Sequence, residues 1–358
     1  MKILMIGLKR YPNSREGGID IVVQNLAEQL VKLGHDVTIL VRRKKGYNPP
    51  DVYNGVKIKK VFTINFKFTD AIIYSYFATK YAKKHNFDIV HFHAEGNTLF
   101  LKKLRNKHDT KIVVTIHGLD WKRGKFKGLG TKILLKSERA IAKYADEIIT
   151  LCENDNLYFQ NTYNVKTTVI PNGVNNPCFL KPNIIKSKFG LENDYLLFLA
   201  RIVPEKGLHY LIDAYNGIDN PRYKLVVAGG SSHSKEYYEE MKNKASNNPN
   251  ILFTGFVQGD ELNELFSNCI LYILPSLIEG MPISLIEALS FKKPCLCSDI
   301  EELKNIGSNN IYYFKNGNVD DLKVKLNLLM NDIPSYKNEH ILVGWDEVAK
   351  KTLDLYQK

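Results

Sequence analysis

The amino-acid sequence predicts a two-domain α/β protein whose sheets are parallel, and three observations support this fold class. First, strand-like and helix-like patterns alternate along most of the 358 residues. Second, the strand-like runs are almost continuously apolar, as in strands that helices cover on both faces. Third, the Pro-, Gly- and Asn-rich segment PNGVNNPCF at residues 171–179 divides the alternation into two halves of ordinary domain size.

The first half supports this fold class element by element. It opens with the apolar run KILMIG at residues 2–7, and a helix is expected at residues 19–33, where apolar side chains recur on one face before Gly34. The alternation continues with strands expected near residues 37–41, 56–62, 87–93, 111–118, 147–151 and 167–171, and with helices expected near residues 71–84, 99–107 and 132–144.

The second half repeats the pattern. Strands are expected near residues 195–201, 223–230, 251–256, 269–276 and 294–300, with helices between the first four and after the fourth. We therefore expect two Rossmann-like domains, at residues 1–170 and 171–335, that face each other across a cleft. The helical residues 336–358 are expected to pack on one of the two domains, with the first domain as the candidate. Open parallel sheets bind ligands beyond the carboxyl ends of their strands, so functional residues are sought there.

Composition indicates the compartment. No apolar run reaches the ~20 residues that a membrane-spanning helix requires. No signal peptide is recognised at the N-terminus. The five cysteines are scattered and odd in number, so no disulfide framework is expected. These features predict a cytoplasmic protein.

The basic charge is concentrated in the first half. The net charge is +12, and residues 1–170 hold 30 Lys and Arg against 15 Asp and Glu, whereas residues 171–358 hold 20 against 23. Solvated lysine-rich faces explain this charge, and so does a surface for an anionic membrane or a lipid-phosphate acceptor. Nucleic acid is disfavoured because no nucleic-acid-binding motif accompanies the charge. Peripheral association with the inner face of the plasma membrane is therefore the partner hypothesis.

Two cations follow an apolar strand in LARIVPEKGLHYLIDAY, residues 199–215. Arg201 ends the strand, and Lys206 lies five residues later at a Gly-led helix start. Both side chains can converge at one strand-to-helix turn, where Arg forks onto phosphate oxygens and Lys supplies a point charge. Two exposed loop cations are the alternative interpretation.

The segment LPSLIEGMPISLIEALS, residues 274–290, is the most informative part of the sequence. A strand ends in a loop that carries Glu279 and Gly280, and Pro282 is suited to the first turn of the helix that follows. Amides at residues 281–284 would be helix-N-terminal donors for a phosphate or a sugar hydroxyl. Glu287 lies among apolar residues, where an unpaired carboxylate is costly, so the two hydroxyls of a ribose are candidate partners. A solvated helix face is the alternative.

The first half offers weaker candidates at strand ends. Gly18 follows Gly17 between the first strand and the first helix, where the backbone can approach a phosphate, although a plain turn explains the pair equally well. His117 ends a strand on the cleft side, with a structural hydrogen-bonding role as the alternative. Asp120 and Trp121 follow it and are acceptor-binding candidates.

No metal site is expected. His91 and His93 alternate along one strand but lack a recognisable third ligand, and Cys295 and Cys297 lack a second pair and are interpreted as buried thiols. No Asp-x-Asp motif occurs, which argues against a divalent ion held by carboxylates on a diphosphate. A Walker A loop is also absent from the sequence.

These motifs resemble those of the retaining GT-B glycosyltransferases of family 4, also called group 1, over nearly the whole chain. Arg201 and Lys206 match the family's R-x4-K-G pattern, and Glu279 and Glu287 match its E-x7-E motif. The PNG at residues 171–173 matches its interdomain turn.

The resemblance implies roles for these residues. Arg201 and Lys206 would hold the donor diphosphate, and Glu287 the ribose. Glu279 would hold the transferred sugar, whose hydroxyls His117 would touch. The residues implied to bind the donor are Gly18, Arg201, Lys206, Glu279, Gly280, Met281, Pro282, Ile283 and Glu287. The residues implied to be catalytic are His117, Arg201, Lys206 and Glu279.

The implied activity is a retaining transfer of a hexosyl or deoxyhexosyl group from a nucleotide-diphosphate sugar to a lipid-linked or polysaccharide precursor. No cofactor or metal is implied, because cations and helix dipoles would oppose the charge that grows on the leaving diphosphate. Two alternatives remain open. One is another nucleotide-sugar enzyme of the same architecture, an epimerase or phosphorylase. The other is a non-enzymatic basic protein that binds membrane or nucleic acid.

Overall fold

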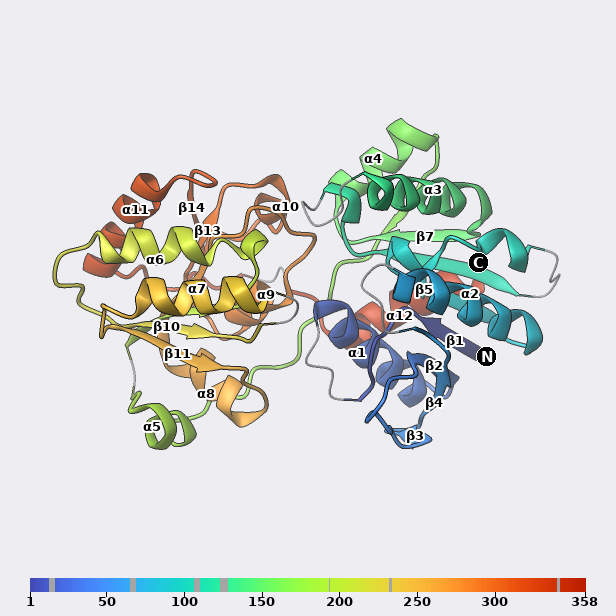
Figure 1. The fold of residues 1–358 in the computed structure, drawn as a ribbon, viewed down its shortest axis with the longest axis horizontal. Coiled ribbons are helices and arrows are strands. Elements are labelled where there is room, and N and C mark those ends of the chain that lie inside the picture. Colours follow the sequence, from blue (N-terminus) through green and yellow to red (C-terminus); the bar gives the residue numbers. More distant parts are fainter. Residues whose placement is uncertain are drawn as a thin grey trace. The chain divides into compact units, whose positions relative to one another are not determined.

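The computed structural model describes residues 1–12, 17–64, 69–105, 110–122, 128–192, 194–231, 234–339 and 342–358. The chain forms two compact units: unit 1 is Met1–Gly173 with Val343–Lys358, and unit 2 is Val174–Leu342. Each unit has its own sheet with helices packed on it (Figure 1). The prediction of a two-domain α/β fold with parallel sheets is therefore confirmed. None of the helices in the described chain combines the length and apolarity that crossing a bilayer requires.

The sheet of unit 1 has the strand order β3-β4-β2-β1-β5-β6-β7-β8. All neighbouring pairs are parallel except β3 and β4. The strands are β1 (Lys2–Ile6), β2 (Asp36–Arg42), β3 (Val52–Tyr53), β4 (Val56–Val61), β5 (Ile89–His93), β6 (Lys111–Ile116), β7 (Glu147–Thr150) and β8 (Thr168–Val169). The chain moves outward from β1 to one edge and then returns to β5 on its other side. The strand order therefore reverses between β1 and β5, where open sheets bind ligands.

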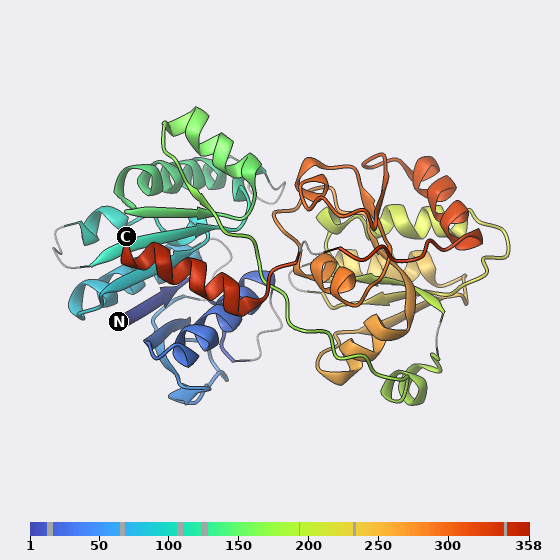
Figure 2. The same cartoon turned by 180° about the vertical axis from the view of Figure 1, so that it is seen from behind.

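The helices of unit 1 cover the apolar faces of these strands. They are α1 (Gly18–Lys32), α2 (Thr69–Lys84), α3 (Leu129–Tyr144), α4 (Glu153–Tyr163) and the C-terminal α12 (Trp345–Gln357), with short 3₁₀ turns η1 (Glu95–Asn97), η2 (Leu101–Leu104) and η3 (Asp120–Lys122). Figure 2 shows α12, in red, lying along unit 1. The Tyr356 hydroxyl of α12 lies 2.6 Å from Nδ1 of His91 in β5, and Lys111 Nζ donates to the Leu355 carbonyl oxygen at 2.7 Å.

Unit 2 has the strand order β11-β10-β9-β12-β13-β14, and its neighbouring strands pair in parallel. The strands are β9 (Tyr195–Leu199), β10 (Leu225–Ala228), β11 (Ile251–Gly255), β12 (Cys269–Leu274), β13 (Cys295–Ser298) and β14 (Ile311–Phe314). The helices are α5 (Ile184–Phe189), α6 (Leu208–Asn216), α7 (Lys235–Ala245), α8 (Asp260–Asn268), α9 (Ile283–Ser290), α10 (Glu301–Lys304) and α11 (Val319–Asn331), with the 3₁₀ turn η4 (Pro204–Lys206). Here the strand order reverses between β9 and β12.

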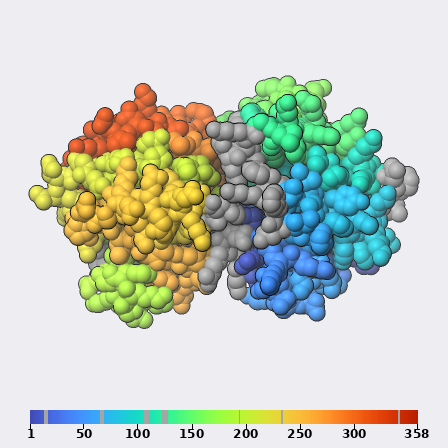
Figure 3. Space-filling model, viewed as in Figure 1, coloured from blue at the N-terminus to red at the C-terminus, as the bar shows by residue number. Residues whose placement is uncertain are grey.

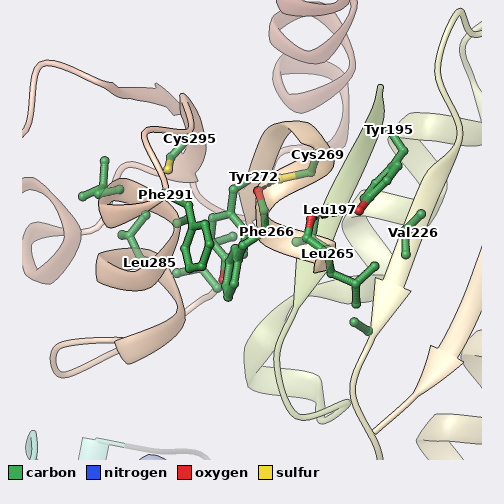
Figure 4. Packing of buried hydrophobic residues seen from close by; sticks show 14 of the residues in the cluster. Tyr195, Leu197, Val226, Leu265, Phe266, Cys269, Tyr272, Leu285, Phe291 and Cys295 are labelled. Carbon is green, nitrogen blue, oxygen red and sulfur yellow. Dashed lines mark hydrogen bonds between the residues drawn. The ribbon is translucent and has the colours of Figure 1, made fainter. Parts of the chain in front are cut away.

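Aromatic side chains fill one of the two apolar layers of unit 2. Phe266 of α8 stacks on Phe291, which follows α9, with ring centroids 5.4 Å apart and planes 18° apart. Figure 4 shows these rings beside Tyr272 of β12, and Tyr195 of β9 belongs to the same layer. Because this layer holds α9 against the sheet, it fixes the loop at the carboxyl end of β12.

Some elements differ from the expectation. In the described residues, the helix expected at residues 99–107 is only the 3₁₀ turn η2, in which Leu101 and Leu104 are buried. The helix α4 was not expected. Its buried face includes Asp155 and Asn156 beside Phe159, so the sequence carries no apolar stripe.

Candidate functional site

The predicted cations of unit 2 lie where the strand order reverses. β9 leads into Arg201, η4 and α6, whereas β12 leads into residues 275–282 and α9. Because β9 and β12 are parallel neighbours, both loops leave the sheet at the same edge. This pairing brings the R-x4-K-G and E-x7-E segments together, although 73 residues separate Lys206 from Glu279.

Gly207 allows the two loops to touch. Its φ is +68°, and a Cβ atom at this position would lie 1.9 Å from the carbonyl oxygen of Pro275. The backbone N–H of Leu277 also donates to the carbonyl oxygen of Glu205 at 2.9 Å. Only glycine fits such a backbone contact, so residue 207 fixes the approach of the Lys206 turn to the loop after β12.

Lys206 and Glu279 form an ion pair in this contact. Their side chains are only 15% and 7% exposed, so most of this pair is shielded from water. Arg201 is partly buried and makes no ion pair or side-chain hydrogen bond with the described residues. Glu279 neutralises one of the two cations, and the site keeps the positive charge of Arg201 for an anion.

Glu287 lies in α9, one turn beyond the loop. Its side chain is partly buried and makes no hydrogen bond or ion pair with the described part of the chain. Burial raises the pKa of this carboxyl group from 4.5 to about 7. A carboxylate that lacks a protein partner is costly, and a ligand with hydroxyl donors would supply the missing partner.

The loop before α9 places further predicted residues. Gly280 and Pro282 are buried, Met281 is partly buried, and Pro282 is the N-cap residue rather than part of the first turn. The helix begins at Ile283, and the first N–H groups to find an acceptor at the N-cap are those of Leu285 and Ile286, which donate to the Pro282 carbonyl oxygen at 3.2 and 3.4 Å. The N–H groups of Ile283 and Ser284 therefore have no acceptor within the helix.

Tyr272, which sequence reasoning missed, fixes this helix start. Its hydroxyl group donates to the carbonyl oxygen of Leu199 at 3.1 Å and lies 2.7 Å from Oγ of Ser284. Tyr272 therefore ties the end of β9 to the first turn of α9. Its position as one apolar residue in the buried run CILYIL gave no signal of this role.

The remaining predicted residues belong to unit 1. Gly18 is the exposed first residue of α1, and Gly17 is its N-cap; Arg15 and Glu16 lie outside the described residues. His117 follows β6 and is 8% exposed, with Nε2 3.1 Å from Nδ1 of His93.

The acceptor candidates Asp120 and Trp121 contact Glu95 and Tyr158 of unit 1, respectively. The N–H of Asp120 donates to Oε2 of Glu95 at 3.2 Å. The Trp121 ring lies 6.0 Å from the Tyr158 ring, between centroids. Burial, and next the charge of Asp120, raise the pKa of Glu95 well above its ordinary value. An acceptor role for Asp120 and Trp121 stays a prediction.

The other histidine and cysteine candidates are structural. His91 uses both ring nitrogens, on the Tyr356 hydroxyl and on Oγ1 of Thr115 at 2.7 Å. Cys295 and Cys297 are buried free thiols, as expected. Within the described ranges, no group of three His, Cys, Asp or Glu side chains is arranged to hold a metal ion.

Two family models match the chain. The model described as Glycosyltransferase Family 4 matches residues 16–176, and the model described as Glycosyl transferases group 1 matches residues 181–340. The two matches adjoin near residues 177–180, and each covers most of one of the two halves that the sequence pattern separates.

Individual relatives are similar over long stretches. The chain is 26% identical to an uncharacterized glycosyltransferase of Methanocaldococcus jannaschii, MJ1607, over 100% of this chain and 98% of that protein. It is 28% identical to an Escherichia coli UDP-Gal:alpha-D-GlcNAc-diphosphoundecaprenol alpha-1,3-galactosyltransferase, over 75% of this chain and 69% of that one. Its fold is similar to sucrose-phosphate synthase from Thermosynechococcus elongatus, with a TM-score of 0.85, 18% identity, and coverage of 99% and 98%.

Proposed function

The chain belongs to the group 1 glycosyltransferases, and from this premise we propose that unit 2 holds a nucleotide-diphosphate sugar whose glycosyl group passes to a glycan or lipid-linked acceptor. The observation that carries the proposal is the group of charges at the edge where β9 and β12 end. Arg201 is a cation without a partner among the described residues, beside the Lys206–Glu279 pair. Glu287 supplies a carboxylate that lacks a partner within the same set of residues.

The chemistry follows from these charges. When the bond between the sugar and the diphosphate breaks, negative charge grows on the leaving group. Arg201 and the N–H groups at the start of α9 oppose this charge, and Lys206 joins them if Glu279 turns to the sugar hydroxyls. Glu287 accepts hydrogen bonds from the ribose. We propose that no metal is required, so that transfer continues in EDTA, and that the sugar keeps its anomeric configuration.

Binding of the donor by unit 2 can be tested through the thermal stability of the whole chain. We expect one of a set of UDP-, GDP- and dTDP-sugars, hexosyl and deoxyhexosyl, to raise the melting temperature, since a ligand that binds only the native state stabilises it. Arg201→Gln should weaken that ligand about 10- to 100-fold, the usual loss for a hydrogen bond to a charged group. Arg222→Gln removes an exposed charge elsewhere in unit 2 and is the matched control. Equal affinity in Arg201→Gln and wild type would contradict the proposal.

The need for an acceptor distinguishes the alternatives. The name of the E. coli relative gives a sugar-diphosphoundecaprenol as its acceptor, which supports a lipid-linked acceptor for this chain. Donor turnover should therefore depend on a polyprenyl-diphosphate sugar, and NMR of the product should show the anomeric configuration of the donor. Turnover without any acceptor would favour an epimerase, and turnover that depends on phosphate would favour a phosphorylase.

We also propose that unit 1 docks on an anionic membrane at the inner face of the plasma membrane. An aromatic row, consisting of Phe62, Phe77, Tyr76 and Phe100, lies at the surface beside α2. Successive ring centroids are 5.2, 5.2 and 5.5 Å apart, and Phe62 and Tyr76 are 45% and 36% exposed. Lys103 Nζ lies 4.3 Å from the centre of the Tyr76 ring. The segment of α2 forms part of the surface of unit 1 seen in Figure 3.

Basic residues accompany the aromatic row. Lys80, Lys83 and Lys84 follow Tyr76 along α2 and are exposed. Aromatic rings favour the membrane–water interface, and each Lys near an anionic surface contributes about 1 kcal/mol. The combination supports a lipid surface rather than a simple solvated face.

Vesicle flotation tests this surface. Wild type should float with phosphatidylglycerol vesicles and not with phosphatidylcholine vesicles, and the binding should fall with salt. Replacing Phe62 and Tyr76 with serine should weaken it. Leu328→Ser, which removes a 59% exposed apolar residue from α11 of unit 2, is the matched control. No flotation of wild type at low salt would refute the docking proposal without affecting donor binding.

A further inference from the structure

Three histidines lie in a row at the carboxyl ends of β5 and β6 in unit 1. The ring centroids of His91 and His93 are 4.1 Å apart, and those of His93 and His117 are 5.4 Å apart. The parallel register places His93 beside Thr115, two residues before His117, so the three rings share one face of the sheet. His91 and His93 are fully buried, and His117 is 8% exposed.

The backbone around His93 is held tightly. Nδ2 of Asn97 donates to the His93 carbonyl oxygen at 2.7 Å. A Cβ atom at Gly7, at the end of β1, would lie 2.5 Å from the same oxygen, so β1 approaches as closely as a glycine permits. Ala94, the next residue, has a φ of +67°, an uncommon conformation for a residue with a side chain. His93 therefore has little freedom to shift.

The hydrogen bonds of His93 fix where its proton sits. Nδ1 contacts Nε2 of His117 at 3.1 Å, whereas Nε2 is buried without a hydrogen-bond partner in the described residues. Burial lowers the pKa of His93 well below its ordinary value, and the positive charges that His91 and His117 could carry lower it further. The ring is thus neutral and carries one proton.

Two placements of that proton differ in cost. A proton on Nε2 would form a buried N–H group for which the described residues offer no acceptor. Such a group costs the free energy of removing a hydrogen-bond donor from water. On Nδ1, the proton is donated to Nε2 of His117, and only a lone pair of His93 stays unpaired. Since His117 then accepts at Nε2, its own proton must reside on Nδ1.

We propose that His93 is a positioning residue that holds His117 in the Nδ1-protonated tautomer and in one ring orientation. The imidazole of His117 therefore meets the transferred sugar in a single protonation pattern. The part that concerns the sugar rests on the proposed glycosyl transfer, whereas the part that concerns the tautomer stands on the geometry alone.

Nitrogen NMR of protein with ¹⁵N-labelled histidine tests the tautomer without any substrate. In wild type, the Nε2 signal of His117 should be that of an unprotonated nitrogen, and Nδ1 should carry the proton. His93→Phe keeps a ring of similar volume but removes the donor, and it should release His117 to exchange between tautomers. His93→Asn places an amide near the position of Nδ1 and should restore the wild-type pattern.

Kinetics then separate positioning from simple stability. His93→Phe should lower kcat about tenfold or more, with the donor KM changed less than twofold, because the loss concerns orientation in the transition state. His93→Asn should recover most of kcat. Tyr356→Phe is the matched control: it removes the partner of His91 on the same strand but leaves the contact between His93 and His117. It should lower the melting temperature while kcat stays unchanged.

Several results would overturn the proposal. A protonated Nε2 on His117 in wild type would do so at once, whichever variants fold. An unchanged His117 tautomer in His93→Phe would also contradict it, and so would equal losses of kcat in His93→Phe and Tyr356→Phe. If no donor is turned over, the glycosyl-transfer proposal fails, and the NMR spectra still decide the tautomer.

Discussion

Replacing Glu287 with glutamine should stabilise unit 2 while it weakens donor binding. In the ligand-free protein, the Glu287 carboxylate is partly buried, and the described residues offer it no hydrogen bond or ion pair. Burial raises its pKa from 4.5 to about 7. Glutamine keeps the shape of the side chain and removes the charge, so the variant isolates the cost of burying that charge.

The size and sign of the effect follow from the two pKa values. Below pH 4.5 the carboxyl group is protonated in both states, and it does not disfavour folding. As the pH rises from 4.5 to about 7, the unfolded chain loses this proton before the folded chain does, so stability falls and then levels off. The difference corresponds to about 3 kcal/mol, an upper value because the side chain is only partly buried. The variant should therefore match wild type near pH 4 and exceed it near pH 8.

The assay must follow unit 2. Both tryptophans, Trp121 and Trp345, belong to unit 1, so their fluorescence in urea reports mainly that unit. Far-UV circular dichroism follows both units, and a transition that shifts in circular dichroism but not in fluorescence belongs to unit 2. Donor affinity, measured separately by calorimetry, should fall about 10- to 100-fold in the variant, because ribose hydroxyls lose a charged acceptor.

The two measurements together decide the interpretation. If Glu287→Gln is no more stable than wild type at pH 8, the carboxylate already has a partner in the folded protein, and the reasoning from burial is wrong. If donor affinity is unchanged, Glu287 does not contact the ribose. A gain in stability together with a loss in affinity is the combination that both arguments require.

Two further changes test how the site is assembled. Lys206→Ala leaves the 7% exposed Glu279 without its cation and should lower the free energy of unfolding in urea by about 3–5 kcal/mol. The double variant Lys206→Met with Glu279→Gln should recover most of that loss. Equal stabilities of the single and the double variant would contradict a buried ion pair. Gly207→Ala places a Cβ 1.9 Å from the Pro275 carbonyl oxygen and should lower the melting temperature and the donor affinity together. Gly307→Ala is the control, with φ +71° and nothing within 4 Å, and should cost only about 1 kcal/mol.

Most strands were predictable because parallel strands are buried on both faces and read as apolar runs. The helix α4 was not predictable from an apolar pattern, because its buried face includes the polar residues Asp155 and Asn156. The C-terminal helix begins at Trp345 rather than near residue 336, since residues 332–339 form no helix.

The candidate site was predictable in its residue types and not in their partners. Motif spacing placed Lys206 and Glu279 at one sheet edge, and the resemblance assigned them separate ligands. Their ion pair depends on Gly207 packing against Pro275, a contact between positions distant in the sequence. His93 was noted only as a metal candidate, because a local pattern does not reveal that a ring nitrogen meets His117 from the next strand.

The return of the chain to unit 1 after unit 2 sets the order in which these two units are completed on the ribosome. All of unit 2 has been synthesised before α12 emerges, so the nascent chain can close its second unit while its first is still missing a helix. Until then, β5 lacks the Tyr356 partner of His91, and the surface that α12 covers with Trp345, Val348 and Leu355 stays open to water. The thirteen residues of α12 thus complete the unit that was begun first.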